Sequence, residues 1–355
     1  MNILPTNGSG IRPDDSGPHN GRPVGSVCQL RALCRAATRA GVDCRRIILD
    51  LGLNPTCIAD DINAVAPVAV ICEAFEAAAE AAADPFLGLR AAQDYRPADL
   101  QALGYAIDHQ PNLRASLTFM VNHIHEYSHA VDLSFAVDAS RARLAYQLVE
   151  PRVRRKRQRT EYAIGCLIQI IRRIVGESWH PLEVHFEHDD RGMRRNYAAM
   201  LGCRVVFDHY TNAVHFDASA LTTVNRHADA ELLPFLTAQL GRSAAACDPE
   251  MNFVTRVRRS IDTLLGDDAP TETRVANTLD VGERTLRRRL TRHGTSFKQL
   301  VDEVRYRRAL ALLERRDMSL AEVARLLGYS SQSCFTRSFR RWTGSTPTTF
   351  RHRRN

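Results

Sequence analysis

The chain has 355 residues, of which 44% are hydrophobic, so it is too long for one small module and suits two domains that each bury a core. Its formal net charge of +8 is divided unevenly: residues 251–355 carry 22 Lys and Arg against 11 Asp and Glu, whereas residues 1–250 carry 26 against 29. This asymmetry favours a basic domain that binds a polyanion beside a nearly neutral domain, with a merely solvated basic surface as the alternative.

Several classes of protein are excluded by simple patterns. The nine cysteines are scattered, with no C-x-x-C pair and no spacing typical of a zinc site or a disulfide framework. The longest apolar run, Ala163–Ile171, is nine residues and contains Gln169, whereas a membrane helix needs about 20. Residues 1–25 lack the apolar core of a signal peptide. We therefore expect a cytoplasmic protein with reduced cysteines, no membrane association and no cofactor.

The first domain is predicted to be α+β. Residues 1–25, with four prolines and five glycines, are expected to be a disordered leader. Apolar spacing of three and four residues then predicts helices, and alternating apolar residues predict strands. The expected helices begin near Cys28 and cover 67–83, 97–109, 111–127, 158–175 and 190–200. The expected strands form a hairpin at 131–149 and lie at 182–186, 204–207 and 213–216. We assign 26–240 to this domain and 241–250, which contains small residues and breakers, to a linker.

Two polar clusters in this domain invite a functional interpretation. His123, His125 and His129 form H-x-H-x₃-H, but on a helix His123 points about 200° away from His125, so we predict no metal site. The basic run 152–159, RVRRKRQR, is interpreted as a solvated loop or a helix start. The sharper alternative is that it attracts an acidic effector or a DNA phosphate.

The strongest local signal is SLAEVARLLGYSSQSCFTRSFRRWT at 319–343. Ser319 and Glu322 form a capping box, Gly328 suits a left-handed turn, and Ser330 or Ser331 caps the next helix. In that helix Phe335, Phe339 and Trp342 form a buried stripe. Ser333, Thr336, Arg337 and Arg340 fall on a different face. This is the layout of a helix-turn-helix, whose second helix enters the major groove of DNA.

The same plan appears at about 271–293. Val275, Ala276 and Leu279 form the inward face of a first helix, and Leu286 and Leu290 that of a second. The second helix carries Arg284, Arg287 and Arg288 on its outward face, and Gly294 ends this helix. The first helix is expected to fray, because Arg274 stands where an acidic residue would favour the helix start and Glu272 where an apolar residue would pack.

A single helix is predicted between these two units, at 296–314, with Ser296 and Gln299 as its capping box. At 1.5 Å per residue it is about 28 Å long. One turn of duplex DNA is about 34 Å, so a stiff connector of this length suits two recognition helices in successive major grooves. The predicted fold is therefore an α+β domain followed by an all-α domain, 251–355, with two helix-turn-helix motifs bridged by a linker helix.

The strings RTLRRRLTRHGTSFKQLVDEVRYRRALALL and SLAEVARLLGYSSQSCFTRSFRRWTGSTPTTFR strongly resemble the AraC/XylS family of bacterial transcription regulators. The resemblance implies that Arg284, Arg287 and Arg288 contact bases or phosphates in one unit, and that Ser333, Cys334, Thr336 and Arg337 do so in the other. For each arginine, a phosphate contact without sequence information stays an open alternative. For Arg340, Arg341 and Arg351 we expect phosphate contacts.

Residues 28–240 resemble more loosely the arabinose-binding-type effector domain of the same family, through DPFLGLR, DLQALGYA, WHPLEVHFEH and YAAMLGCRVVF. Gln101 stands where this pattern commonly has glycine. The resemblance implies a small-molecule or lipid effector, a homodimer, promoter DNA as the partner, and RNA polymerase as a further partner if the chain is an activator.

The function predicted from the sequence is thus a ligand-responsive, sequence-specific transcription regulator and not an enzyme. The alternatives are a nonspecific architectural DNA-binding protein and a DNA-targeted enzyme. Against the enzyme, the chain contains no G-x-S-x-G, H-E-x-x-H, P-loop or zinc-deaminase signature.

Overall fold

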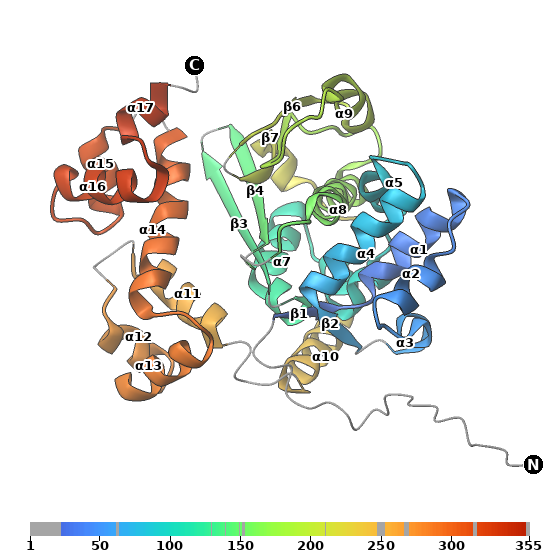
Figure 1. The fold of residues 1–355 in the computed structure, drawn as a ribbon, viewed down its shortest axis with the longest axis horizontal. Coiled ribbons are helices and arrows are strands. Elements are labelled where there is room, and N and C mark those ends of the chain that lie inside the picture. The colour runs from blue at the N-terminus through green and yellow to red at the C-terminus, as the bar shows by residue number, and fades with distance from the viewer. Residues whose placement is uncertain are drawn as a thin grey trace, which may run out of the picture.

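The computed structural model describes residues 23–61, 64–128, 130–138, 140–148, 150, 153–209, 211–246, 253–265, 270–314 and 318–352. Its N-terminal part combines helices with strands and its C-terminal part is helical, as the sequence predicts (Figure 1). Most of the expected leader, residues 1–22, lies outside the described residues. Val24 and Gly25, also assigned to the leader, belong to the first strand.

The N-terminal part begins with a small two-stranded antiparallel sheet and a set of helices. Strands β1 and β2 pair from Val24 with Pro67 to Ser26 with Val65. The elements of this region are β1 (Val24–Ser26), α1 (Gln29–Arg39), α2 (Cys44–Asp50), α3 (Pro55–Asp60), β2 (Val65–Pro67), α4 (Val68–Ala81), α5 (Leu87–Gln93), the 3₁₀ helix η1 (Pro97–Leu100), α6 (Gln101–Asp108) and α7 (Leu113–Tyr127). The predicted helices at 67–83, 97–109 and 111–127 are confirmed as α4, η1 with α6, and α7.

The main sheet has five strands in the order β3-β4-β7-β5-β6, so β3 lies at one edge. Neighbouring strands are antiparallel except β5 and β6, which are parallel. Its strands and the elements between and after them are β3 (Val131–Asp138), β4 (Arg141–Leu148), α8 (Arg157–Val175), β5 (Glu183–His185), α9 (Arg194–Leu201), β6 (Arg204–Val206), β7 (Asn212–Asp217), η2 (Ala218–Thr222) and α10 (Leu232–Ala246). The predicted hairpin and all three further strands are confirmed.

Helix α8 is the central element of this part. Fifteen of its residues are buried, and it packs against α5, α4 and β7. The basic run 152–159 leads into it, which confirms the interpretation as a helix start: Arg157 and Arg159 are only 9% and 5% exposed. Arg157 pairs with Glu161 at 2.8 Å, and Arg155 pairs with Glu73 and Glu80 on α4. Arg157 and Arg159 therefore do not face a DNA phosphate in this conformation.

The predicted linker, 241–250, is partly helical. Helix α10 continues to Ala246, and residues 247–250 lie outside the described residues. The physical reason is the run of alanines before Cys247, because alanine has the highest helix propensity and one glycine in a helix costs only about 1 kcal/mol.

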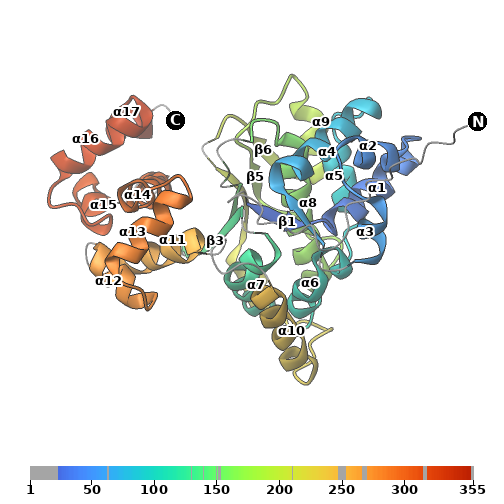
Figure 2. The same ribbon diagram turned by 60° about the horizontal axis from the view of Figure 1, so that its bottom comes forward.

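The C-terminal part consists of seven helices among the described residues. They are α11 (Phe253–Leu264), α12 (Glu272–Thr278), α13 (Glu283–Arg292), α14 (Phe297–Glu314), α15 (Leu320–Leu326), α16 (Gln332–Thr343) and α17 (Pro347–His352). Helix α14 stands between the N-terminal sheet and helices α15 and α16 (Figures 1 and 2). The sequence reasoning did not predict α11 and α17.

At two positions of the N-terminal motifs, the structure gives a steric or conformational reason for the presence of glycine. A Cβ at Gly88, in DPFLGLR, would lie 2.1 Å from the backbone oxygen of Gln158, so α5 and α8 approach more closely than a side chain allows. Gly202, in YAAMLGCRVVF, has φ +71° and ends α9. At Gln101, where the pattern commonly has glycine, φ is +55°, which explains the usual preference.

We expect Gly88→Ala to lower the free energy of unfolding by about 1–3 kcal/mol, because the added methyl group forces α5 away from α8. Calorimetry of the full chain would show this as a lower midpoint for the N-terminal part. Gln93→Ala, on the exposed face of α5, is the control and should change stability by less than about 0.5 kcal/mol. Equal midpoints for both variants would contradict the close contact.

Candidate DNA-binding surface and the interdomain cleft

The helix pair α15–α16 is defined by local caps. Ser319 and Glu322 form a complete capping box, as predicted. Gly328 has φ +69° in the turn, and the Ser331 hydroxyl accepts a hydrogen bond from the Cys334 backbone N–H at 3.2 Å. These groups satisfy backbone donors at the start of each helix, so the pair has a fixed turn.

A small core then fixes which face of α16 points outward. Phe335 and Phe339 are fully buried against Val323, Ala324 and Leu327 of the neighbouring helix, and Trp342 packs against this core. On the opposite side Ser333, Arg337 and Arg340 are exposed, and Cys334 and Thr336 are half-buried. The structure thus places the five predicted residues of α16 on or beside one solvent-facing surface.

Cys334 and Arg337 are in contact on this surface. The Arg337 guanidinium donates to the Cys334 Sγ at 3.4 Å. Hydrogen bonds from Ser331, Arg337 and Ser330 lower the pKa of the Cys334 thiol below its usual value.

The helix pair α12–α13 has the same design. Val275, Ala276, Leu286 and Leu290 are buried in a second small core. The Thr271 hydroxyl caps α12 by accepting from the Arg274 N–H at 3.3 Å, and Gly294 beyond α13 has φ +68°. The sequence reasoning did not identify Thr271 as a cap.

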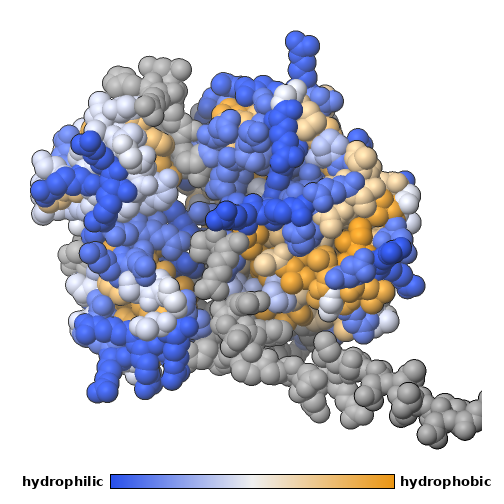
Figure 3. All heavy atoms as spheres, viewed as in Figure 1, coloured by the Kyte–Doolittle hydropathy of each residue, from blue (hydrophilic) through white to orange (hydrophobic). Residues whose placement is uncertain are grey.

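The three predicted arginines of α13 are all exposed, but they differ in their partners. Arg287 forms an ion pair with Glu272 on α12 and a weaker one with Glu283 at 3.8 Å. Among the described residues Arg284 and Arg288 form no ion pair. Hydrophilic side chains project from this region, over α12 and α13 (Figure 3).

Helix α14 joins the two pairs by supplying apolar side chains to both cores. Phe297, Leu300, Val301 and Val304 are buried in the core of α12 and α13, and Ala309, Leu310 and Leu313 are buried in that of α15 and α16. With 18 residues, α14 is about 27 Å long.

Polar contacts of α14, which the sequence reasoning missed, fix the second pair further. Arg305 donates to the backbone oxygens of Leu327 and Gly328 at 3.0 and 3.1 Å and lies over the Tyr329 ring. Arg341 of α16 pairs with Asp302 at 2.9 Å. Arg351, like Arg341 expected to contact phosphate, donates to the backbone oxygen of Leu313 at 3.3 Å.

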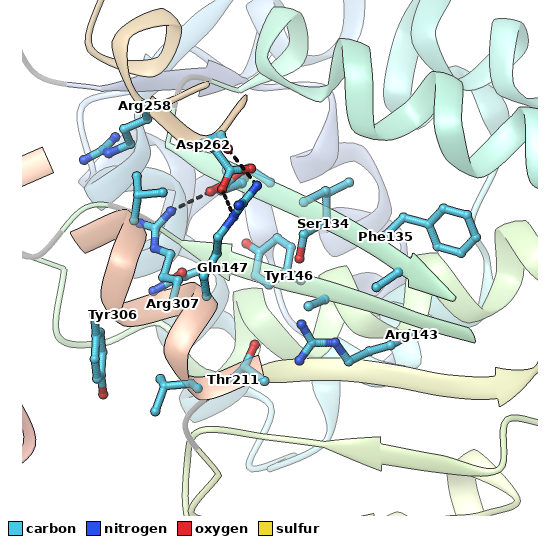
Figure 4. Close-up of a pocket in the computed structure, with 18 residues that line it drawn as sticks. Ser134, Phe135, Arg143, Tyr146, Gln147, Thr211, Arg258, Asp262, Tyr306 and Arg307 are labelled. Atoms are coloured by element: carbon cyan, nitrogen blue, oxygen red, sulfur yellow. Dashed lines mark hydrogen bonds and ion pairs between the residues drawn. The ribbon is translucent and has the colours of Figure 1, made fainter. Parts of the chain in front are cut away.

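A cleft of about 380 Å³ lies between the β3–β4 hairpin and helices α11 and α14 (Figure 4). Arg307 of α14 donates to Asp132 of β3 at 2.5 Å, which joins the two parts of the chain. The other arginines of α11 and α14 in the cleft are also paired: Arg258 with Glu303 at 3.1 Å and Arg308 with Asp262 at 2.7 Å. The three arginines that α11 and α14 place in the cleft are therefore each neutralised by a carboxylate.

The histidines of α7 do not form a metal site with the other residues that the structure describes. His123 stacks on Phe119 and pairs with Glu126, while His129 lies outside the described residues. No cluster of three or more His, Cys, Asp and Glu side chains suited to a metal occurs in the part of the chain that the structure describes. Within that part, no helix has both the length and the apolar character needed to cross a membrane.

Comparisons with known proteins identify two domains. The N-terminal arabinose-binding domain of AraC transcription regulators matches residues 41–224, and a helix-turn-helix domain matches residues 275–353. The ornithine utilization regulator of Pseudomonas aeruginosa is 29% identical over 268 residues, which cover 76% of this chain and 79% of that protein. The transcriptional regulator VirS of Mycobacterium tuberculosis is 28% identical over 229 residues, or 64% and 67% of the two chains.

A solved structure gives a weaker similarity. The crystal structure of transcriptional regulator CdpR from Pseudomonas aeruginosa covers 92% of this chain and 98% of its own, at 19% identity. The TM-score of 0.46 is too low to support a conclusion about this chain.

The Arg287–Glu272 pair generates a prediction about DNA affinity. We expect Glu272→Gln to strengthen binding to duplex DNA of mixed sequence, because it removes a negative charge and releases Arg287. The slope of log K against log salt should become steeper by about 0.9, the effect of one additional phosphate contact. Fluorescence anisotropy at several salt concentrations measures both quantities.

The exposed Glu231, in the N-terminal part, supplies the control, since Glu231→Gln makes the same charge change far from α13 in the sequence. If Arg287 can contact DNA without leaving Glu272, Glu272→Gln and Glu231→Gln should have the same affinity and the same salt slope. Equal values in the two variants would therefore contradict the prediction.

Proposed function

Because the chain belongs to the family of AraC transcription regulators with an arabinose-binding N-terminal domain, we propose that it reads promoter DNA through two helix-turn-helix units. It is a transcription regulator with a helix-turn-helix DNA-binding region. In the proposal, α12–α13 and α15–α16 are the two units, α13 and α16 enter successive major grooves, and α14 is the linker helix between them.

The observation that carries this proposal is the packing of α14 into both small cores. Because α14 supplies apolar residues to each core, the two exposed arginine faces move as one unit rather than as two tethered domains. Its length of about 27 Å is close to one helical turn of DNA, about 34 Å.

The side chains proposed to contact DNA differ in their freedom to do so. On α13, Arg284 and Arg288 are exposed, whereas Arg287 must first leave Glu272. On α16, Ser333, Cys334, Thr336 and Arg337 are proposed for the groove and Arg340 for a phosphate. A bidentate contact from an arginine to guanine O6 and N7 is worth about 1–3 kcal/mol of discrimination.

The N-terminal domain is proposed to bind a small-molecule or lipid effector and to pass its presence to the DNA-binding region. We propose that this domain covers about 26–240 and the DNA-binding region 251–355. The Asp132–Arg307 contact supports a direct route, since it links an edge strand of the first domain to the linker helix of the second. An effector that moves β3 therefore changes the position of α14.

Replacement of single arginines tests whether both helix-turn-helix units recognise DNA bases. We expect the wild-type chain to protect a site with two segments about one helical turn apart. Arg288→Ala should lose base discrimination in one segment and Arg337→Ala in the other, by about 1–3 kcal/mol each. Footprinting and binding to single-base variants of the site, against competitor DNA, measure this.

The exposed Arg46 of α2 provides the control, since Arg46→Ala removes the same charge from the first domain. Equal loss of affinity on every sequence would show that Arg288 and Arg337 are phosphate clamps. Protection of a single groove, or no preference for any duplex, would overturn the proposal in favour of a nonspecific architectural role.

We also propose a homodimer, with RNA polymerase as a further partner if the chain is an activator. Light scattering of the full chain should give a mass near 80 kDa, twice the 39.8 kDa of one chain. A mass of one chain at micromolar concentration, with and without DNA, would contradict the dimer.

A further inference from the structure

A second, much smaller cavity lies inside the N-terminal domain, on the other face of the β3–β4 hairpin from the cleft. It measures about 40 Å³ and is lined by residues of α7, α8 and the hairpin. Most of its wall is apolar, with Met120, Ile124, Leu167 and Ile170 among the lining residues. The polar side chains that reach this cavity therefore require an explanation.

The first of these is Arg159, whose side chain is buried without a negative partner. It is 5% exposed, and no carboxylate of the described residues lies within 4.0 Å of it. Its one hydrogen bond goes to the Tyr146 hydroxyl at 3.1 Å, although a guanidinium has five N–H donors. Arg157, two residues earlier, shows the usual arrangement, because it pairs with the buried Glu161. A buried charge without such a counter-ion is costly.

Two tyrosine hydroxyls beside Arg159 are also available. The Tyr146 oxygen accepts from Arg159, so its own O–H can still donate. Among the described residues the buried Tyr162 hydroxyl has no oxygen or nitrogen partner, and its polar neighbour is the Cys166 thiol, a weak acceptor. Tyr127, by contrast, donates to the backbone oxygen of Asp99 at 2.9 Å. Burial raises the pKa of Tyr162 well above its usual value, so it remains a donor at neutral pH.

We propose that this cavity binds the carboxylate of a small apolar monocarboxylic acid, with Arg159 pairing with the carboxylate and Tyr162 and Tyr146 donating to it. One buried positive charge matches one negative charge, and the apolar wall matches a short hydrocarbon body rather than a sugar or a phosphate. The inference rests on the proposed effector response of this domain and names the chemical class of the effector. Arg258, Arg307 and Arg308 in the interdomain cleft are less suited to this role because they already have carboxylate partners.

The position of the cavity connects it to DNA binding. Val131, Leu133 and Tyr146 line both the cavity and the interdomain cleft. Asp132 lies between Val131 and Leu133 in the sequence and pairs with Arg307 of α14 at 2.5 Å. Because β3 is an edge strand, it can shift while breaking hydrogen bonds to one neighbour only. An acid that expands the cavity therefore changes the contact between the hairpin and α14.

Calorimetric titration of the full chain, without DNA, tests the proposal. The probes are the straight-chain acids from propionate to octanoate, with butan-1-ol, butylamine and inorganic phosphate as ligand controls. We expect at least one acid to bind with one molecule per chain, and the three controls not to bind. Absence of binding by every acid, or equal binding of butan-1-ol or phosphate, would overturn the proposal.

Three variants locate the site. Arg159→Gln should weaken binding of the best acid at least 100-fold, and Tyr162→Phe, which removes one hydroxyl and keeps the ring, about 5- to 10-fold. Arg154→Gln, an exposed arginine of the same basic run, should bind as the wild type does. If Arg159→Gln does not fold, as judged by circular dichroism, Tyr162→Phe decides the question alone. Unchanged affinity in Tyr162→Phe would then overturn the assignment.

The result of the acid-binding experiments does not depend on whether the proposed DNA recognition is correct. A chain that binds DNA at a two-segment site but binds no acid overturns only this inference. A chain that binds the acid through Arg159 but does not select any DNA sequence overturns only the proposed recognition of DNA.

Discussion

The sharing of α14 between two hydrophobic cores is the constraint on which the rest of the C-terminal region depends. Each helix pair completes its core with side chains from one half of α14, and the first core also contains Phe253, Val257 and Ile261 of α11. A helix packed at both ends cannot rotate relative to either pair without exposing apolar surface. The orientation of α13 relative to α16 is therefore a packing property, and the contacts of Arg305 and Arg341 reinforce it.

The β3–β4 hairpin plays the corresponding part in the N-terminal domain. Because side chains alternate across a strand, β3 presents Val131 and Leu133 to the interior and Asp132 to α14. One strand thus borders the small apolar cavity and the interdomain cleft. Any shift of β3 therefore changes the shape of both the small cavity and the interdomain cleft.

The arginines show why net charge alone is a coarse guide to a binding surface. Of those in the C-terminal region, Arg258, Arg305, Arg307, Arg308 and Arg341 form ion pairs or bind backbone oxygens within the protein. Arg284, Arg288 and Arg340 are exposed on the two candidate recognition helices. The positive charge therefore serves both the packing of the helices and a surface for DNA. Of these two groups, only the second forms no ion pair with the residues that the structure describes.

Features that depend on neighbouring residues could be predicted from the amino-acid sequence. Apolar spacing placed α7, α8, α14 and the hairpin, and Ser319 with Glu322 marked the start of α15, because helix periodicity and capping act over three or four residues. Ion pairs between remote segments could be identified only in the folded chain. Glu272 holds Arg287 from another helix, and Arg159 lies in an apolar interior although its neighbours in the sequence are basic. The physical reason is that burial and ion pairing depend on distances between segments that are remote along the chain, and no local pattern encodes those distances.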